Sequence, residues 1–213
     1  MVKKYLVSLG LFVLTALTGQ VAASPLVTGI ASNGGFESGF SGYLATMPGS
    51  SVVSSATATS GTVYNPTEGG YFAKIDSNSS TWCGHIVSGS CSLVSSFIHM
   101  KKGNTFQFNW AFLTDKHTDI NDFGLFMLNV DHTILADVES VGDHGDTGWQ
   151  TFSWTADDEF FGIVSWLALS PGTTPGDSSL LVDNAQVLPE PGSIALFGLG
   201  LLGMAMSRRR KLP

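Results

Sequence analysis

The feature that most constrains the fold is an alternation of aromatic and polar residues in the run NTFQFNWAF, which begins at Asn104. Aromatic residues stand at every second position, namely Phe106, Phe108, Trp110 and Phe112. Successive side chains of a β-strand point to opposite faces, so one face of this segment is wholly aromatic. Such a face has to be buried against a second layer. The run therefore predicts a strand of a packed sheet.

Shorter β-type runs fill the rest of the chain between residues 24 and 187, and they are separated by Gly, Pro, Asn, Asp and Ser. Candidate strands are residues 51–59, 70–75, 92–99, 104–112, 124–130, 133–138, 149–154, 162–169 and 179–188. No long apolar pattern of helical period interrupts them. Many short strands with regular turn signals are typical of an all-β fold, here a jelly-roll β-sandwich over residues 24–187.

The first 23 residues have the layout of a secretory signal peptide. Lys3 and Lys4 precede an apolar stretch from Tyr5 to Leu17, and small residues end at Ala23. This order predicts export and cleavage after Ala23. The alternative is an uncleaved membrane anchor, but the apolar stretch is shorter than the ~20 residues that a spanning helix needs.

Export places the mature chain in an oxidising compartment. Cys83 and Cys91 are its two cysteines, and a disulfide between them is expected. Because the closed loop is small, the bond should stabilise the fold near the lower part of the usual ~2–4 kcal/mol range. Two cysteines with His85 do not complete a zinc site.

The C-terminal 26 residues, 188–213, follow a different order. Pro189, Glu190 and Pro191 come first, an apolar segment spans residues 193–207, and four basic residues follow, Arg208, Arg209, Arg210 and Lys211. At about 1.5 Å per residue the apolar segment makes a helix of about 20 Å, shorter than the ~30 Å hydrocarbon core. The order predicts a short transmembrane helix with a cytoplasmic basic stop, presented transiently to a processing enzyme in the inner membrane.

These residues resemble the PEP-CTERM sorting signal of Gram-negative bacteria. The resemblance implies that an exosortase, a membrane transpeptidase-like protease, recognises Pro189, Glu190 and Pro191 and removes the tail. It also implies delivery to the cell surface or to the extracellular polymer matrix. The alternative is a simple tail anchor, which would leave a membrane-tethered periplasmic protein.

The two ends of the body are similar to galactose-binding-like jelly rolls, many of which are carbohydrate-binding modules. The run SNGGFESGFSGY opens at Ser32, and LVDNAQV begins at Leu181. The resemblance implies that Glu37 and Asp183 ligate a structural calcium ion, which takes six to eight hard oxygen ligands. The alternative is that Glu37 caps a turn and Asp183 meets solvent.

Two acidic loops are further candidates for metal binding. Asp115 to Asp122 lies between two strong strands, and residues 143–146 hold Asp143, His144 and Asp146. The first loop lacks the spacing of an EF-hand, and the glycines of the second fit a hairpin connection. Solvated turns, in which Asp and Asn satisfy their own backbone, are the alternative that the residues favour.

No catalytic motif is present in the sequence, so we expect a protein that is not an enzyme. There is no Gly-x-Ser-x-Gly, no paired histidine motif and no glycine-rich phosphate loop. An exported hydrolase with an unrecognised site stays open, because sandwiches host many functions.

Charge excludes one class of partner. The chain carries a formal net charge of -7, and residues 24–187 hold four lysines against sixteen carboxylates, which gives 4 - 16 = -12. Such a body repels nucleic acid. Aromatic rings beside polar groups suit polysaccharide contact, and Tyr64 and Trp82, which stand in polar surroundings, are the candidates. Core packing is the alternative, and it is the more common role for each ring taken singly. A structural or adhesive matrix protein without a glycan pocket is the alternative function.

Overall fold

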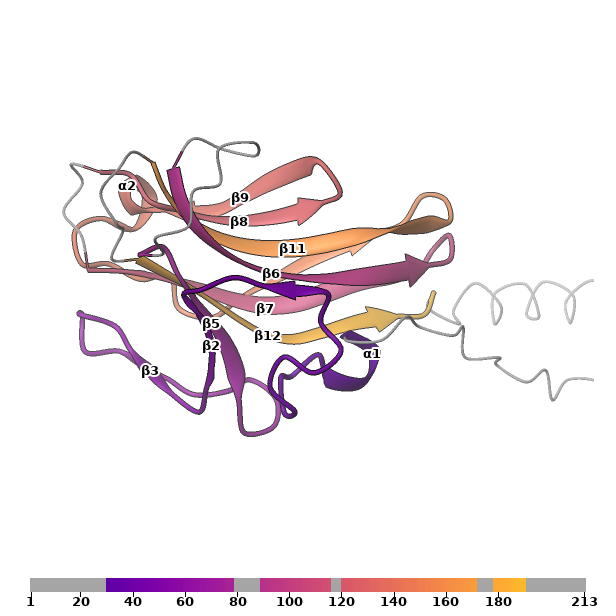
Figure 1. Cartoon of the computed structure of the whole chain (residues 1–213), viewed down its shortest axis with the longest axis horizontal. Coiled ribbons are helices and arrows are strands. Elements are labelled where there is room, and N and C mark those ends of the chain that lie inside the picture. The colour runs from indigo at the N-terminus through magenta and orange to yellow at the C-terminus, as the bar shows by residue number, and fades with distance from the viewer. Residues whose placement is uncertain (1–29, 79–88, 116–119, 172–177, 191–213) are drawn as a thin grey trace, which may run out of the picture.

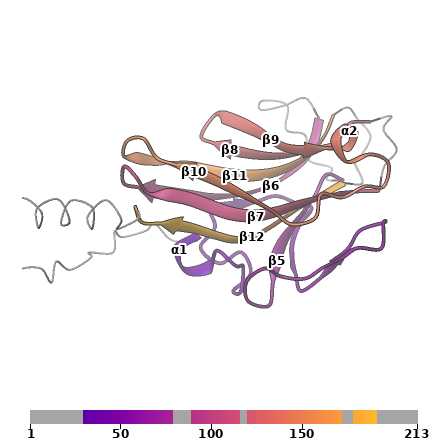
Figure 2. The same cartoon turned by 180° about the vertical axis from the view of Figure 1, so that it is seen from behind.

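The computed structural model describes residues 30–78, 89–115, 120–171 and 178–190, and these form two antiparallel sheets packed face to face (Figure 1). Sheet A has the order β1 (Ala45–Thr46), β6 (Gly89–Met100), β11 (Phe160–Pro171), β8 (Phe123–Leu128) and β9 (Asp131–Asp137). Sheet B has the order β10 (Gln150–Thr155), β7 (Thr105–Thr114), β12 (Ser178–Leu188), β5 (Phe72–Asp76) and β2 (Ser50–Val53). Figure 2 shows sheet B in front of sheet A. The predicted all-β sandwich is confirmed.

Each predicted strand region contains observed strand, but residues 51–59 were wrongly predicted to be one element. They contain β2, which pairs with β5 in sheet B, and β3 (Ala56–Thr57), which pairs with β4 (Val63–Tyr64) in a separate hairpin. The chain turns at two exposed serines between β2 and β3. β1, β4 and the two four-residue helices α1 (Ile30–Asn33) and α2 (Val138–Val141) had no counterpart in the prediction.

The core lies between the sheets and is dominated by aromatic rings. The predicted aromatic face of β7 is confirmed, since Phe106, Phe108 and Phe112 are fully buried. Phe108 lies 4.9 Å from Phe126 and 5.5 Å from Trp166, centroid to centroid. The buried Nε1–H of Trp166 has no hydrogen-bond partner among the described residues. Ring packing therefore dominates around Trp166.

The β3–β4 hairpin covers part of the outer face of sheet B. Ala56, Ala58 and Tyr64 pack on Phe72 and Leu181, which point away from the main core. Figure 1 shows the hairpin as an arm beside β2 and β5. A second, smaller apolar cluster thus lies outside the sandwich.

Several predictions about the ends of the chain lie outside the described residues. These are the signal peptide of residues 1–23 and the apolar segment of residues 193–207 with its basic stop. Within the part of the chain that the structure describes, no helix has the length and apolar composition needed to cross a membrane. The last strand runs to Leu188, one residue beyond the predicted end of the body.

Candidate functional site

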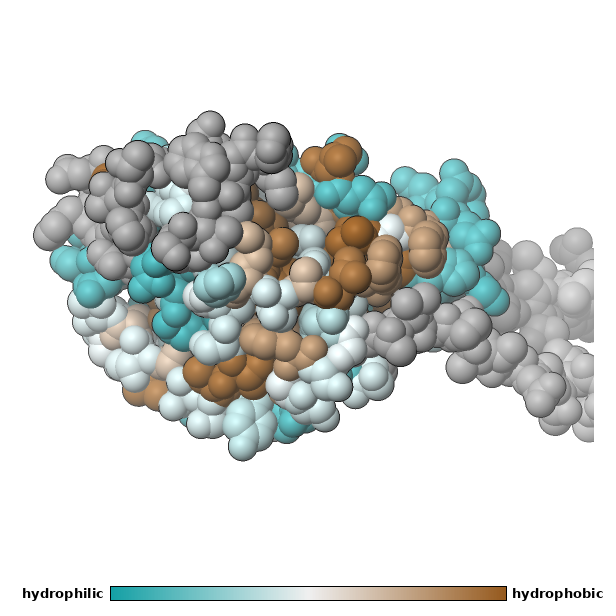
Figure 3. All heavy atoms as spheres, viewed as in Figure 1, coloured by the Kyte–Doolittle hydropathy of each residue, from teal (hydrophilic) through white to brown (hydrophobic). Residues whose placement is uncertain are grey.

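The outer face of sheet A carries an exposed aromatic group. Side chains of β6 and β11 alternate between the core and the outer face. On β6 the core receives Val94 and Ile98, so Phe97, next to Ile98, points outward. On β11 the core receives Val164, so Phe161, three positions earlier, also points outward. Figure 3 shows apolar side chains gathered over the middle of β6 and β11 on this face.

Three residues form what we call the aromatic face: Phe97, His99 and Phe161. The rings of Phe97 and Phe161 are nearly parallel, with centroids 6.0 Å apart and planes 11° apart. His99 pairs with Phe161 across the two strands and meets its ring edge to face at 6.1 Å. Phe161 is 65% exposed, and it precedes Val164, the first residue of β11 that pairs with β8, so β6 is its paired neighbour. A large apolar ring near the start of β11 is left open to solvent.

A polar pair borders the aromatic face. Nε2 of His99 lies 2.8 Å from Oε1 of Glu159, which is itself exposed at the turn before β11. Apolar ring faces beside hydrogen-bonding groups are the combination that a sugar requires, because one fixes the ring plane and the other the orientation.

The structure brings together the two motifs that open and close the body. The backbone N–H of Ala185 in β12 donates to the carbonyl of Gly34 at 3.0 Å. A Cβ on Gly34 would lie 1.8 Å from the carbonyl oxygen of Ala185, so only glycine allows this approach. Phe36 has φ of 59° and is fully buried, and its ring stacks on Tyr43 at 5.0 Å.

Glu37 and Asp183 hold the same loop, residues 65–71, from two sides. Oδ2 of the buried Asp183 accepts hydrogen bonds from the backbone and hydroxyl of Thr67 and from the backbone N–H of Glu68, at 2.6, 2.8 and 3.0 Å. Oε1 of Glu37 accepts from the backbone N–H groups of Gly70 and Tyr71 at 2.8 and 2.9 Å. We call this arrangement the loop clamp. Burial, and secondly the charge of Asp183, raise the pKa of Tyr43 far above its ordinary value.

The loop clamp does not present an assembled cation site. Oδ2 of Asp183 already accepts three donors, and Oδ1 accepts the N–H of Asn184 at 2.7 Å. Among residues 30–78, 89–115, 120–171 and 178–190, no three His, Cys, Asp or Glu side chains form a group that could hold a metal ion. Calcium takes six to eight oxygens, and the clamp in the described arrangement presents only part of such a set. Calcium bound by Glu37 and Asp183 stays a prediction.

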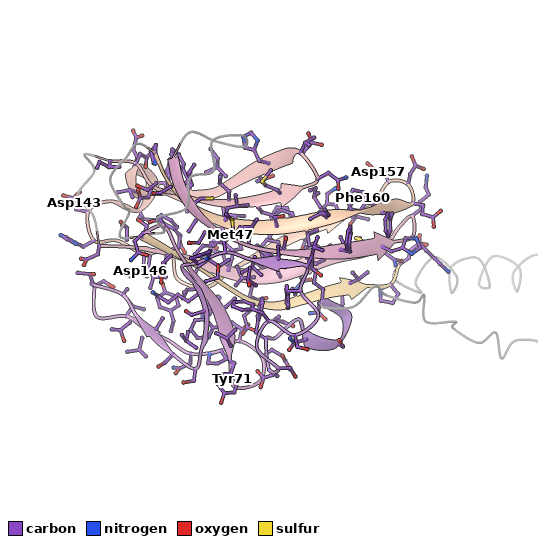
Figure 4. The ribbon with its side chains drawn as sticks, in the orientation of Figure 1. Met47, Tyr71, Asp143, Asp146, Asp157 and Phe160 are labelled. Carbon is purple, nitrogen blue, oxygen red and sulfur yellow. The ribbon has the colours of Figure 1, made fainter. Side chains whose placement is uncertain are left out.

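Asp146 fastens the β3–β4 hairpin to the rest of the domain. Its carboxylate accepts hydrogen bonds from the hydroxyl groups of Tyr64 and Ser60, both at 2.6 Å, and from Thr62 at 3.3 Å. The N–H of Gly148 also donates to it at 3.2 Å. We call Asp146 with these four donors the latch. Figure 4 shows Asp146 at the end of the sandwich opposite Asp157 and Phe160.

The latch changes the ionisation of its members. Burial acts to raise the pKa of Asp146, but the hydrogen bonds from Ser60, Tyr64, Gly148 and Thr62 outweigh it and the pKa is lowered. Burial, followed by the hydrogen bond to Asp146, raises the pKa of Tyr64 far above its ordinary value. Asp146 is therefore held as the carboxylate.

The acidic loops serve as contacts between segments. Asp115 accepts a hydrogen bond from Thr59 of the hairpin loop at 2.9 Å, and its Oδ1 lies 3.0 Å from Nδ1 of His144. Asp122 is buried and accepts from Ser77 at 3.0 Å. Residues 116–119 lie outside the described chain, so metal binding by the whole loop stays untested.

The predicted glycan contacts have different outcomes. Tyr64 is 2% exposed and its hydroxyl is held by Asp146, so its ring is not available to a sugar, because the hairpin folds over sheet B. Trp82 and Cys83 lie outside the described residues. Cys91 takes part in a disulfide, as expected of an exported chain.

Sequence reasoning missed the aromatic face and the latch. The run SSFIHM alternates, with Phe97 and His99 on the face opposite Ile98, and this period was the available signal for the aromatic face. The latch joins positions 82 to 86 residues apart, and no local pattern reports such a contact.

Two kinds of known protein are similar to this chain. Residues 187–211 match the PEP-CTERM protein-sorting motif. The body is similar in fold to solved carbohydrate-binding modules. The family 16 carbohydrate-binding module-2 has 13% identity and a TM-score of 0.42, with 73% of this chain and 96% of that chain covered.

TmCBM61, solved in complex with β-1,4-galactotriose, has 15% identity and a TM-score of 0.42, with 76% of this chain and 99% of that chain covered. The CBM22-1 xylan-binding domain from Paenibacillus barcinonensis has 12% identity and a TM-score of 0.34, with coverages of 68% and 85%. No curated protein sequence matches the chain.

Proposed function

We propose that this chain is a non-enzymatic exported protein, sorted by an exosortase to the cell surface or extracellular polymer matrix, where the aromatic face contacts glycan. The PEP-CTERM motif at residues 187–211 supports the first half. The exposed ring of Phe161 beside Phe97 and the His99–Glu159 pair supports the second half.

The sorting half is tested by the intact mass of the chain recovered from cell envelope and medium. We expect a mature form that begins at Ser24 and ends between Pro189 and Pro191. Cleavage after Ala23 and removal of the basic residues would both be visible in one spectrum. A steady-state form that keeps Arg208 to Lys211 would instead identify a membrane-tethered periplasmic protein.

Glycan contact by the aromatic face is supported by the free energy that an exposed Phe161 ring loses when no ligand covers it. Leaving a Phe side chain in water forgoes about 1.5–3 kcal/mol that burial would give. Phe161 lies near the exposed start of β11, where a polar residue would fit equally well. A sugar ring that packs on Phe161 would recover part of this free energy, while His99 and Glu159 bind its hydroxyl groups.

The glycan half is tested by F161A against an array of soluble polysaccharides. We expect affinity to fall about tenfold, which corresponds to roughly 1.4 kcal/mol. The matched control is I134A, because Ile134 is also exposed, at 52%, on an edge strand of the same sheet. It should bind like the wild type.

Two results would contradict glycan contact. Equal binding by F161A and the wild type would remove the aromatic face from the site. Binding to no glycan, together with concentration-dependent dimers that F161A abolishes, would assign the face to a second copy. The chain would then be the structural or adhesive matrix protein of the alternative.

A further inference from the structure

The sorting motif begins inside the folded sheet. The match starts at Val187, which pairs with Phe106 in β7, and Leu188 pairs with Thr105. Val187 also packs against the hydrophobic core. At these two positions β12 pairs with β7 alone, because its pairing with β5 ends at Val182. No free linker therefore separates the folded body from the tripeptide that begins at Pro189.

Glu190 of the tripeptide lies against the body. A Cβ on Gly103 would be 2.9 Å from Cδ of Glu190, so this side chain lies over the turn that joins β6 to β7. That turn is fixed, because the N–H of Gly103 donates to the carbonyl of Ala156 at 2.8 Å. Figure 1 shows β12 ending beside the β6–β7 and β10–β11 turns.

The segment between the end of β12 and Glu190 is too short to extend far from the sheet. Glu190 is two positions after Leu188, and two extended residues span at most about 7 Å. A protease binds several backbone units of an extended substrate in a cleft. Its walls would meet the turns at residues 101–104 and 156–159 before the cleft could enclose the tripeptide.

We infer that the folded sandwich end restricts access to its own sorting motif, so that Glu190 has to leave the β6–β7 turn before the tripeptide is processed. This inference rests on the proposed sorting function and adds a control step to it. The contact is autoinhibitory: it slows processing without altering the residues that the enzyme recognises.

A junction spacer tests this inference in the full-length chain. A short Gly-Ser spacer is inserted between Leu188 and Pro189, and cells that process the wild type are pulse-labelled. The readout is the rate at which intact mass loses Arg208 to Lys211. We expect processing about fivefold faster, the factor given by roughly 1 kcal/mol of opening free energy. The control places the same spacer after Val130, which is 84% exposed, and leaves the rate unchanged.

A second variant removes the contact without lengthening the chain. In G103N the new side chain displaces Glu190, and Asn tolerates the left-handed backbone at φ of 82° better than other residues with a Cβ. We expect faster processing here as well, with a melting temperature close to that of the wild type.

The outcomes separate the two proposals. A wild type that is never processed refutes the sorting function itself. A wild type that is processed, with a junction spacer that leaves the rate unchanged or lowers it, overturns the inference about access. A lower rate would mean that the enzyme recognises the sandwich end together with the tripeptide.

Discussion

Replacing Asp183 with alanine is expected to lower the free energy of unfolding by about 2–4 kcal/mol, because two backbone N–H groups lose their acceptor. These are the N–H groups of Thr67 and Glu68, and the hydroxyl of Thr67 loses its bond as well. Asp183 is fully buried, so water cannot take its place without opening β12. The measurement is urea unfolding, with a lower midpoint at an unchanged slope.

The control for this prediction is E37Q on the other side of the loop clamp. Glu37 is exposed, and the amide oxygen of a glutamine still accepts from Gly70 and Tyr71, so the expected cost is less than about 1 kcal/mol. A D183A protein as stable as the wild type would show that the clamp contributes nothing.

The same variants decide the calcium prediction. If Glu37 and Asp183 bind the ion, Ca²⁺ raises the melting temperature of the wild type and not that of D183A, since a ligand stabilises the state that binds it. Equal melting temperatures of the wild type in Ca²⁺ and in chelator would leave both residues as a hydrogen-bond clamp alone.

Replacing Asp146 with alanine is expected to release the β3–β4 hairpin and to cost about 2–3 kcal/mol. The buried hydroxyl of Tyr64 loses its acceptor, and the hydroxyl groups of Ser60 and Thr62 lose theirs. Hydrogen exchange reports the release directly, because the N–H of Ala58 donates to the carbonyl of Thr62 within the hairpin. The matched control is D157A, an exposed carboxylate at the opposite end.

The contribution of Asp146 depends on pH in a known direction. Its pKa in the folded state is lowered, so the stabilisation is present above the ordinary value of 3.8 and is lost as the pH falls through the folded pKa. The stability difference between wild type and D146A should therefore shrink in acid. A difference that persists unchanged well below pH 3.8 would contradict the role of the charged latch.

The sequence predicted the sandwich because its signals are local. Alternation places Phe106, Phe108 and Phe112 on one face without reference to the rest of the chain. The same logic failed at residues 51–59, where both halves suit a strand but belong to different sheets. The β-propensity of a segment does not specify which strand it pairs with.

The candidate site was harder to predict, because exposure is a property of the assembled fold. Tyr64 stands among polar neighbours in the sequence and is nevertheless buried, since the hairpin carries it onto Phe72 and Leu181. Phe161 sits in an apolar run and is nevertheless exposed. The tertiary arrangement decides whether each of these two rings is buried or exposed, and a single sequence does not specify that arrangement.

The position of β12 imposes an order on synthesis and folding. β12 joins β7 to β5, with registers such as Ser179 opposite Asp76, about half the chain apart. A chain that emerges from an export channel N-terminus first holds sheet B in two unconnected parts until residue 188 has passed. Such distant pairing is slow to form. Completion of sheet B thus waits for nearly the whole chain, and a nascent chain depends on protection from aggregation until then.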